Sequence, residues 1–285
     1  MIKAIRHILQ LTENRGSDSI DISPLSAQTH RVSTRDHIYF CKSVPAGESN
    51  RLVTEASGLK LLREHSELTI PRVYGVEKSS DDRAYILIDW IDFQQPTAID
   101  WACFGRRLAR MHQTTSESFG LDHNNYIGLT RQINAPGKSW FSFFVSNRLL
   151  FQRDIAQKNG LWRDVWSRLL DRTISLFEKM IPSNIKPSLC HGDLWSGNCG
   201  FTAGSPSIFD PAVYYGHYEV DLAMTRLFGG FPFEFYNAYH EINPEVDGTR
   251  DRCDVYNLYH LINHLNIFGK SYEHQVDSIL NRMGS

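Results

Sequence analysis

Residues 190–200 read CHGDLWSGNCG, and this short stretch carries the strongest functional signal in the chain. It places Asp193 and Asn198 five residues apart in a segment with neither helical nor strand periodicity. An Asp on a rigid loop can accept a proton from a substrate hydroxyl, and an Asn can offer a neutral oxygen to Mg²⁺. Asp210 ends the next short apolar run, SIF, and is a second candidate magnesium ligand. Together these residues predict phosphoryl transfer, which needs a positioned hydroxyl, a base and a bound metal ion.

The order and spacing of these residues match the catalytic loop of kinases. That loop pairs an Asp with an Asn five residues later, and a further Asp follows on the next short strand. A single Asp in a loop is more often a turn or cap residue, so Asp193 alone would be weak evidence. We expect His191 to brace the loop by hydrogen bonds, because the loop already offers a carboxylate as base.

The rest of the chain divides into a strand-rich part and a helical part. After a leading amphipathic helix, residues 1–91 alternate several strands with one inserted helix, and residues 92–285 are mainly helical. We therefore expect an α+β, two-lobed, protein kinase-like fold, with a small antiparallel N-terminal lobe for nucleotide and a larger lobe for catalysis and acceptor binding. The cleft between the lobes is the expected ligand site.

The strand-rich part contains a candidate ion pair for binding ATP phosphates. Lys42 ends the run IYFCK, and Glu55 lies on the helix that follows. Each could be an ordinary surface residue, but in this order relative to Asp193 we favour an ion pair. The connector ILIDWID would bind adenine through backbone groups, the carbonyl of Asp89 and the amide of Ile91. Trp90 lies between them and could equally belong to the core.

Composition and charge exclude several classes of function. The net charge is −2, so no basic field indicates nucleic acid or membrane as a partner. No apolar run approaches the length of a membrane span. The five cysteines are scattered without a paired motif, which is typical of reduced thiols in a cytoplasmic protein. Nothing in the sequence indicates an oligomeric state.

At these residues the sequence resembles the fructosamine kinase (ketosamine-3-kinase) family, which shares the aminoglycoside phosphotransferase and protein kinase-like fold. The resemblance rests on TEASGLKLL, IPRVYGV, HGDLWSGN, IFDPAVYYGHYEVDLAMTRLFGGFP and YNLYHLINHLNIFG, which extend over most of the chain. It implies ATP-dependent phosphorylation of the sugar 3-hydroxyl of free or protein-bound ketoamines such as fructoselysine or ribuloselysine, a deglycating repair.

The resemblance also implies a role for each candidate residue. Asp193 is the proton acceptor, and Asn198 and Asp210 hold Mg²⁺. Lys42 with Glu55 serves the ATP phosphates, and residues 89–91 form the adenine hinge. Asp221, in the segment DLAM, braces the catalytic loop.

One segment departs from the family pattern. Members carry a glycine-rich turn between the first two strands, but here residues 23–32 read SPLSAQTHRV, without glycine. Glycine allows close approach of backbone to phosphate. Ser23, Ser26 and Gln28 could donate hydrogen bonds instead, or the turn no longer covers ATP well.

Several alternatives remain open from the sequence. The acceptor could be another hydroxyl compound, such as an aminoglycoside, choline or a ribose derivative, or the chain could be a weakly active pseudokinase that serves as a binding module. His260 and His264 could present two metal ligands on one helix face, although a hydrogen-bonded polar seam facing the cleft is favoured. A set of aromatic residues could form a sugar platform, although most are expected in the core: Tyr214, Tyr215, Phe228, Phe231, Phe233 and Phe235. The segment GGFP at 229–232 is expected to be a turn between helices.

Overall fold

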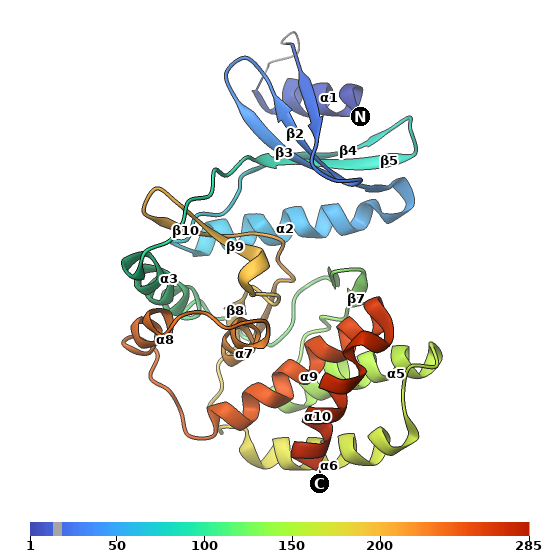
Figure 1. Cartoon of the computed structure of the whole chain (residues 1–285), viewed down its shortest axis with the longest axis vertical. Coiled ribbons are helices and arrows are strands. Elements are labelled where there is room, and N and C mark those ends of the chain that lie inside the picture. The colour runs from blue at the N-terminus through green and yellow to red at the C-terminus, as the bar shows by residue number, and fades with distance from the viewer. Residues whose placement is uncertain (14–18, 285) are drawn as a thin grey trace.

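The computed structural model of the chain describes residues 1–13 and 19–284. A five-stranded sheet lies at one end of the molecule, and most of the helices lie at the other (Figure 1). The last three residues of the leading helix expected from the sequence fall outside the described residues. The division at residues 91 and 92 remains a prediction.

The sheet is entirely antiparallel, with strand order β1-β2-β3-β5-β4. Its strands are β1 (Asp21–Pro24), β2 (Thr29–Ser33), β3 (Ile38–Pro45), β4 (Val73–Ser79) and β5 (Arg83–Asp89). Helix α1 (Ile2–Glu13) precedes the strands, and a 3₁₀ turn (Ala46–Glu48) leads from β3 into α2 (Ser49–His65). The inserted helix expected from the sequence is therefore α2, and the leading helix is a second helix on the same sheet.

Strand β5 explains how this sheet is held between two helices. Its five central residues are all buried, which accounts for the unbroken apolar run AYILI. Tyr85 and Leu87 belong to the cluster that includes Ile5 and Leu9 of α1. The alternate residues of β5 belong to the cluster that includes Leu59 and Leu62 of α2. Because side chains alternate across a strand, α1 and α2 cover opposite faces of the sheet.

The remaining chain is mostly helical and contains three short two-stranded pairings. Its helices are α3 (Ala98–Met111), α4 (Trp140–Phe144), α5 (Phe151–Lys158), α6 (Asp164–Met180), α7 (Glu219–Leu227), α8 (Phe233–His240), α9 (Thr249–Phe268) and α10 (Glu273–Gly284), with a π-helical turn at Val145–Leu150 and 3₁₀ turns at Ser196–Asn198 and Gly269–Tyr272. Its strands are β6 (Asn125–Ile127), β7 (Thr130–Gln132), β8 (Ser188–Cys190), β9 (Cys199–Thr202), β10 (Ser205–Ile208) and β11 (Tyr214–Gly216). They pair as β6 with β7, β8 with β11, and β9 with β10.

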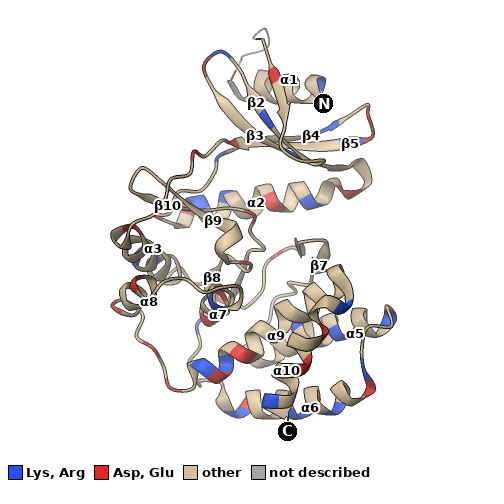
Figure 2. Cartoon of the chain, viewed as in Figure 1, with Lys and Arg blue, Asp and Glu red and all other residues tan. Residues whose placement is uncertain are grey.

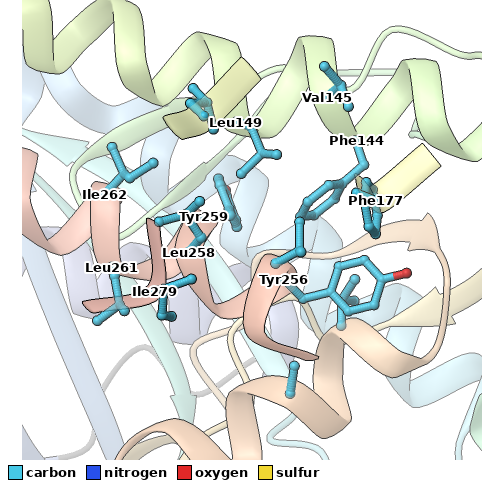
Figure 3. Packing of buried hydrophobic residues seen from close by; sticks show 14 of the residues in the cluster. Phe144, Val145, Leu149, Phe177, Tyr256, Leu258, Tyr259, Leu261, Ile262 and Ile279 are labelled. Atoms are coloured by element: carbon cyan, nitrogen blue, oxygen red, sulfur yellow. The ribbon is translucent and has the colours of Figure 1, made fainter. Parts of the chain in front are cut away.

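Helix α9 forms the centre of the helical part. Most of its residues are buried, and it packs against α4, α6, α7 and α10 (Figure 3). The ring of Phe144 meets the ring of Tyr256 edge to face at 5.0 Å, and Phe177 meets the same tyrosine at 5.5 Å. Replacing one of these buried aromatic side chains by alanine typically costs about 3–5 kcal/mol. This core fixes the platform on which the loops after β8 and β10 are held.

Some sequence-based expectations about these elements were wrong. The amphipathic pattern of residues 98–115 predicts one helix with Ile99 on its apolar face, but α3 ends at Met111 and Ile99 is 81% exposed. Thr97 and Asp100 form a capping box that fixes the start of α3, and Ile99 lies in that first turn, facing solvent. The segment 120–137, expected to be a loop, contains the β6–β7 hairpin.

The distribution of charged residues and the hydropathy of the helices match the expectations from the sequence. Acidic and basic residues are interspersed over the whole molecule (Figure 2). No helix within residues 1–13 and 19–284 is both long and apolar enough to cross a bilayer. All five cysteines are free thiols.

Candidate active site

One buried carboxylate, from α7, holds the loop that follows β8. Asp221 of α7 accepts hydrogen bonds from the backbone amides of His191 (2.7 Å) and Gly192 (2.8 Å). It also contacts Nε2 of His112 at 3.1 Å. Burial opposes its charge, but the hydrogen bond from His112 and its neighbours outweigh burial and lower the pKa of Asp221. The bracing role expected for Asp221 is therefore present in the structure.

Glycine is required at the second position of this loop. Gly192 has φ of +82°, a left-handed conformation that side-chain-bearing residues rarely adopt. A Cβ atom added to it would overlap the carbonyl oxygen of Ala212. This close approach lets the amide of Ala212 donate to the carbonyl of His191 at 2.9 Å, which ties the two acid-bearing loops together.

Asp193 and Asn198 face each other across the loop. The Nδ2 group of Asn198 donates to Oδ2 of Asp193 at 3.0 Å and to its carbonyl oxygen at 2.8 Å. Burial raises the pKa of Asp193 to about 7, with the Asn198 hydrogen bond acting in the opposite direction. The ring of His191 lies 3.0 Å from the carbonyl oxygen of Phe209 through Nε2, so His191 braces the loop as expected. A carboxylate with this pKa can take up a proton near neutral pH.

The expected ion pair between Lys42 and Glu55 is present, and a third group joins it. Nζ of Lys42 lies 2.9 Å from Oε2 of Glu55 and 2.5 Å from Oδ1 of Asp210. Asp210 has φ of +54°, a left-handed conformation that Asp tolerates better than most residues. The ion pair to Lys42 therefore links β3, α2 and the loop after β10.

Two carboxylates share this single ammonium group. Burial and the nearby Asp210 raise the pKa of Glu55 to about 7 despite Lys42. Burial also opposes the charge on Lys42, but the two carboxylates outweigh it and raise its pKa. For Asp210, the Lys42 charge outweighs burial and lowers the pKa. The cluster therefore contains two carboxyl groups and only one ammonium group, so its electrostatics favour binding of a further cation.

All five residues of the predicted catalytic, metal and phosphate set line one cavity of about 260 Å³. These are Lys42, Glu55, Asp193, Asn198 and Asp210. The structure therefore brings together residues that are up to 168 positions apart in the chain.

The predicted adenine hinge does not border that cavity. Asp89, Trp90 and Ile91 line a separate, more open hollow of about 360 Å³. The carboxylate of Asp89 accepts from the Arg72 amide at 2.8 Å and from the Tyr74 hydroxyl at 2.9 Å, so both of its oxygens are engaged within this lobe. Nε1 of Trp90 donates to Asp92 at 2.7 Å, and the Arg31 guanidinium lies 5.7 Å from the Trp90 ring centre. The adenine role of residues 89–91 remains a prediction.

The side chain of Ser26 closes the glycine-free turn between β1 and β2. Oγ of Ser26 accepts from the amides of Gln28 (3.2 Å) and Thr29 (3.1 Å) and lies 2.8 Å from the Thr29 hydroxyl. The Gln28 carbonyl accepts from the Ser43 amide at 2.8 Å. Two amides that a glycine-rich loop would present to phosphate are therefore already bonded within the turn.

Several residues of the cavity were not foreseen as site residues. Tyr126 comes from the β6–β7 hairpin, Trp195 from the loop after β8, and Asn263 from α9, whereas His264 belongs to the polar seam that was expected to face the cleft. The tripeptide YIG at 126–128 was a usable signal, because glycine between apolar residues is typical of a short hairpin.

The two histidines of α9 do not form a common metal site. His264 lines the cavity and donates from Nδ1 to the carbonyl of His260 at 2.8 Å. His260 is 2% exposed, and burial lowers its pKa to about 3. Across residues 1–13 and 19–284, no group of three or more His, Cys, Asp or Glu residues could hold a metal ion. The polar seam on α9 is the interpretation that the structure favours.

The aromatic set divides between core and surface. Tyr214, Phe231 and Phe235 are buried, whereas Phe233 is 69% exposed. Phe228 is half-buried, and its ring lies between Trp195 (5.8 Å) and His264 (5.1 Å) at the edge of the cavity.

Comparison with known proteins identifies a family. The family model described as fructosamine kinase matches residues 3–284. A probable ketoamine kinase of Enterococcus faecium is 39% identical over 258 residues, covering 89% of this chain and 90% of that protein. A chloroplastic protein-ribulosamine 3-kinase of Arabidopsis thaliana is 37% identical over 232 residues, covering 79% of this chain and 70% of that protein.

A solved structure shares the whole fold. The crystal structure of a proposed fructosamine-3-kinase from Haemophilus somnus superposes with a TM-score of 0.91 at 26% identity, covering 99% of this chain and 97% of that chain. The expected α+β, two-lobed, kinase-like fold is thereby confirmed.

Proposed function

The chain belongs to the fructosamine kinase family, and we propose that it transfers the terminal phosphoryl group of ATP to the 3-hydroxyl of a ketoamine such as fructoselysine or ribuloselysine. The names of its relatives, ketoamine kinase and protein-ribulosamine 3-kinase, support this acceptor class. The phosphorylated product decomposes and frees the amine, so the proposed activity is a deglycating repair. The observation that carries the proposal is the shared cavity in which Asp193 faces the Lys42–Glu55–Asp210 cluster.

Asp193 is the proposed proton acceptor. Its Oδ2 is held by the Asn198 amide, which leaves the other carboxylate oxygen for the acceptor hydroxyl. As the bond from the acceptor oxygen to phosphorus forms, the hydroxyl proton passes to the free carboxylate oxygen of Asp193. The bond from phosphorus to the leaving oxygen of ADP breaks in the same step. Burial supports the role, because a pKa of about 7 suits proton uptake at neutral pH.

The phosphate groups of ATP are assigned to Lys42. Glu55 holds the ammonium group in place at 2.9 Å, and both residues border the cavity. The adenine base is assigned to the carbonyl of Asp89 and the amide of Ile91, with Trp90 between them. The Asp89 amide already bonds within the sheet edge, to the Arg72 carbonyl at 3.0 Å, so the carbonyl is the group that remains.

The residues present fit a magnesium ion. Asp210 offers a carboxylate and Asn198 an amide oxygen, which are hard ligands of the kind that Mg²⁺ prefers. The Asn198 nitrogen is used by Asp193, so its oxygen is the free end of the amide. The excess of acid in the Lys42 cluster also favours a further cation. When bound, the ion would neutralise charge on the phosphate oxygens.

The alternative acceptors and the pseudokinase interpretation are less well supported. The acceptor side of the cavity offers Tyr126, Asn263 and His264 instead of an acidic surface for a polycationic aminoglycoside. A pseudokinase has no physical reason to keep the five cavity residues together.

The test is an ADP-release assay with Mg-ATP and a panel of acceptors that includes fructoselysine, ribuloselysine, an aminoglycoside and choline. We expect turnover with a ketoamine, and a fall in kcat of about 10²- to 10⁴-fold in Asp193→Asn, because the base is removed. Asp122→Asn is the matched control, since the Asp122 side chain is 88% exposed and outside the cavity. Unchanged turnover in Asp193→Asn would overturn the assignment of the base.

A further inference from the structure

A second cavity lies on the far side of Phe228 from the candidate active site. It has a volume of about 830 Å³ and is bordered by α7, the turn that follows it, α8, α9 and α10. Its lining includes Arg226, Tyr236, Arg250, Asn257, His274 and Arg282. None of the residues assigned to the phosphoryl transfer borders it.

The charge of this cavity favours an anionic ligand. Three guanidinium groups and one imidazole face two carboxylates, those of Glu245 and Asp254. Arg282 pairs with Asp254 at 2.8 Å, which neutralises one acid with one base. The guanidinium of Arg226 lies 3.8 Å from the ring centre of Tyr236, a cation–π contact that holds it in place. Neither Arg226 nor Arg250 forms a salt bridge with any carboxylate in the described part of the chain, so both can receive an anion.

The wall of this cavity also contains a buried amide with an unpaired hydrogen-bond acceptor. Asn257 is only 7% exposed, and its Oδ1 has no partner among the described residues. A bare anion brings acceptors only, whereas a polypeptide brings N–H donors as well as carboxylates. The combination of free arginines with an unpaired acceptor therefore fits an acidic peptide better than an inorganic ion.

The two cavities share no lining residue, but both border α9. Asn257, Leu261 and His264 lie on one side of α9 at helical spacing, and the first and last are about 10 Å apart along the axis. Phe228 precedes the turn that borders the second cavity, and its ring contacts Trp195 and His264 of the first. In a fructosylated lysine, eight bonds separate the sugar C3 from the lysine Cα, a reach of about 10 Å. The reach of a modified lysine is therefore comparable to the spacing of Asn257 and His264 along α9.

We propose that this second cavity binds the polypeptide that flanks the modified lysine, and that Arg226 and Arg250 select acceptors with Asp or Glu beside that lysine. The inference rests on the proposed ketoamine kinase activity and adds a substrate class to it. Asn257 bonds the peptide backbone, and Arg226 and Arg250 bind the flanking carboxylates. A free ketoamine occupies only the first cavity.

The test compares three acceptors in the ADP-release assay. These are free fructoselysine and two fructosylated peptides that differ only in having Glu or Gln beside the modified lysine. We expect kcat/KM to be about tenfold higher for the acidic peptide than for the neutral one. The double variant Arg226→Glu/Arg250→Glu should abolish that preference and leave turnover of free fructoselysine unchanged. The double variant Lys158→Glu/Arg168→Glu, at exposed positions on α5 and α6 outside this cavity, reverses the same number of charges and is a control that should keep the preference.

The results separate this inference from the proposed function. An equal kcat/KM for both peptides, or an undiminished preference in the double variant, would overturn the peptide site while the ketoamine activity stands. Without turnover of any ketoamine the proposed function fails, and fluorescence anisotropy of the labelled, unmodified acidic peptide then tests the cavity alone. Binding that is lost in the double variant supports the site, and binding that survives overturns it. Displacement of the peptide by inorganic phosphate at equal concentration would also overturn it, because a simple anion site would explain that result.

Discussion

Replacing Asp221 by Asn should uncouple the catalytic loop from the helical core. Asp221 accepts from the amides of His191 and Gly192 and contacts His112, and it is fully buried. An Asn side chain keeps the shape but turns an NH₂ group toward one of these donors. The variant then loses a hydrogen bond to a charged group, about 1.5–3 kcal/mol, and leaves a buried donor unpaired, about 1–3 kcal/mol. We expect a loss of about 3–5 kcal/mol in the free energy of unfolding.

The pH dependence of this loss has a definite sign. The folded-state pKa of Asp221 is lowered, so its contribution to stability is present above the unfolded-state value of about 3.9 and is lost as pH falls through the folded value. The difference between wild type and Asp221→Asn should therefore be complete at pH 7 and shrink below about pH 4.

Urea unfolding at pH 7 measures this effect, with Asp122→Asn as control, because that carboxylate is 88% exposed and should change stability by less than about 0.5 kcal/mol. ATP binding should survive in Asp221→Asn, whereas kcat should fall, because the substitution disturbs the loop that carries Asp193 and leaves the phosphate site intact. A midpoint within error of the wild type at pH 7 would refute the bracing role.

Three further outcomes follow from the same geometry. Because burial raises the pKa of Asp193 to about 7, kcat/KM should fall about tenfold per unit below that pH, and a flat rate profile down to pH 5 would contradict its role as base. Lys42→Met should lower kcat/KM for ATP about 10- to 100-fold, measured by initial rates, because a charged phosphate contact is lost, and wild-type kinetics would exclude that contact. Gly192→Ala should lower the free energy of unfolding, measured in urea, by more than about 2 kcal/mol, because it adds both left-handed strain and an overlap with Ala212. The control Gly204→Ala also has a positive φ but has open space around it, so it should lose only about 1–2 kcal/mol from strain. Equal losses in the two variants would contradict the close approach at Gly192.

The sequence predicted the part of the site that depends on local spacing. Asp193 and Asn198 are five residues apart on one loop, so their proximity follows from chain connectivity. The Lys42–Glu55 pair was predictable from element order, since β3 leads directly into α2. Asp210 was predicted as a magnesium ligand, but its contact with Lys42 spans 168 positions, and nothing in the sequence indicated that contact.

Other features depend on packing that periodicity does not encode. The His112 contact to Asp221 joins the end of α3 to α7, and no local pattern marks that histidine. The polar seam on α9 was foreseen, but which of its residues reach the cavity was not, because the helix is buried on nearly all sides and its apolar stripe does not distinguish core from cleft. The β6–β7 hairpin has only three residues per strand, too few for an alternating pattern to stand out from a loop.

The self-closed β1–β2 turn has a consequence for the thermodynamics of nucleotide binding. A glycine-rich loop samples many conformations when empty and loses that entropy when phosphates order it. Here Ser26 has already bonded the amides of Gln28 and Thr29, so the turn becomes ordered when the chain folds. Calorimetry should accordingly record a small entropic penalty on ATP binding, together with a modest enthalpy, because few backbone groups in the turn remain to be engaged.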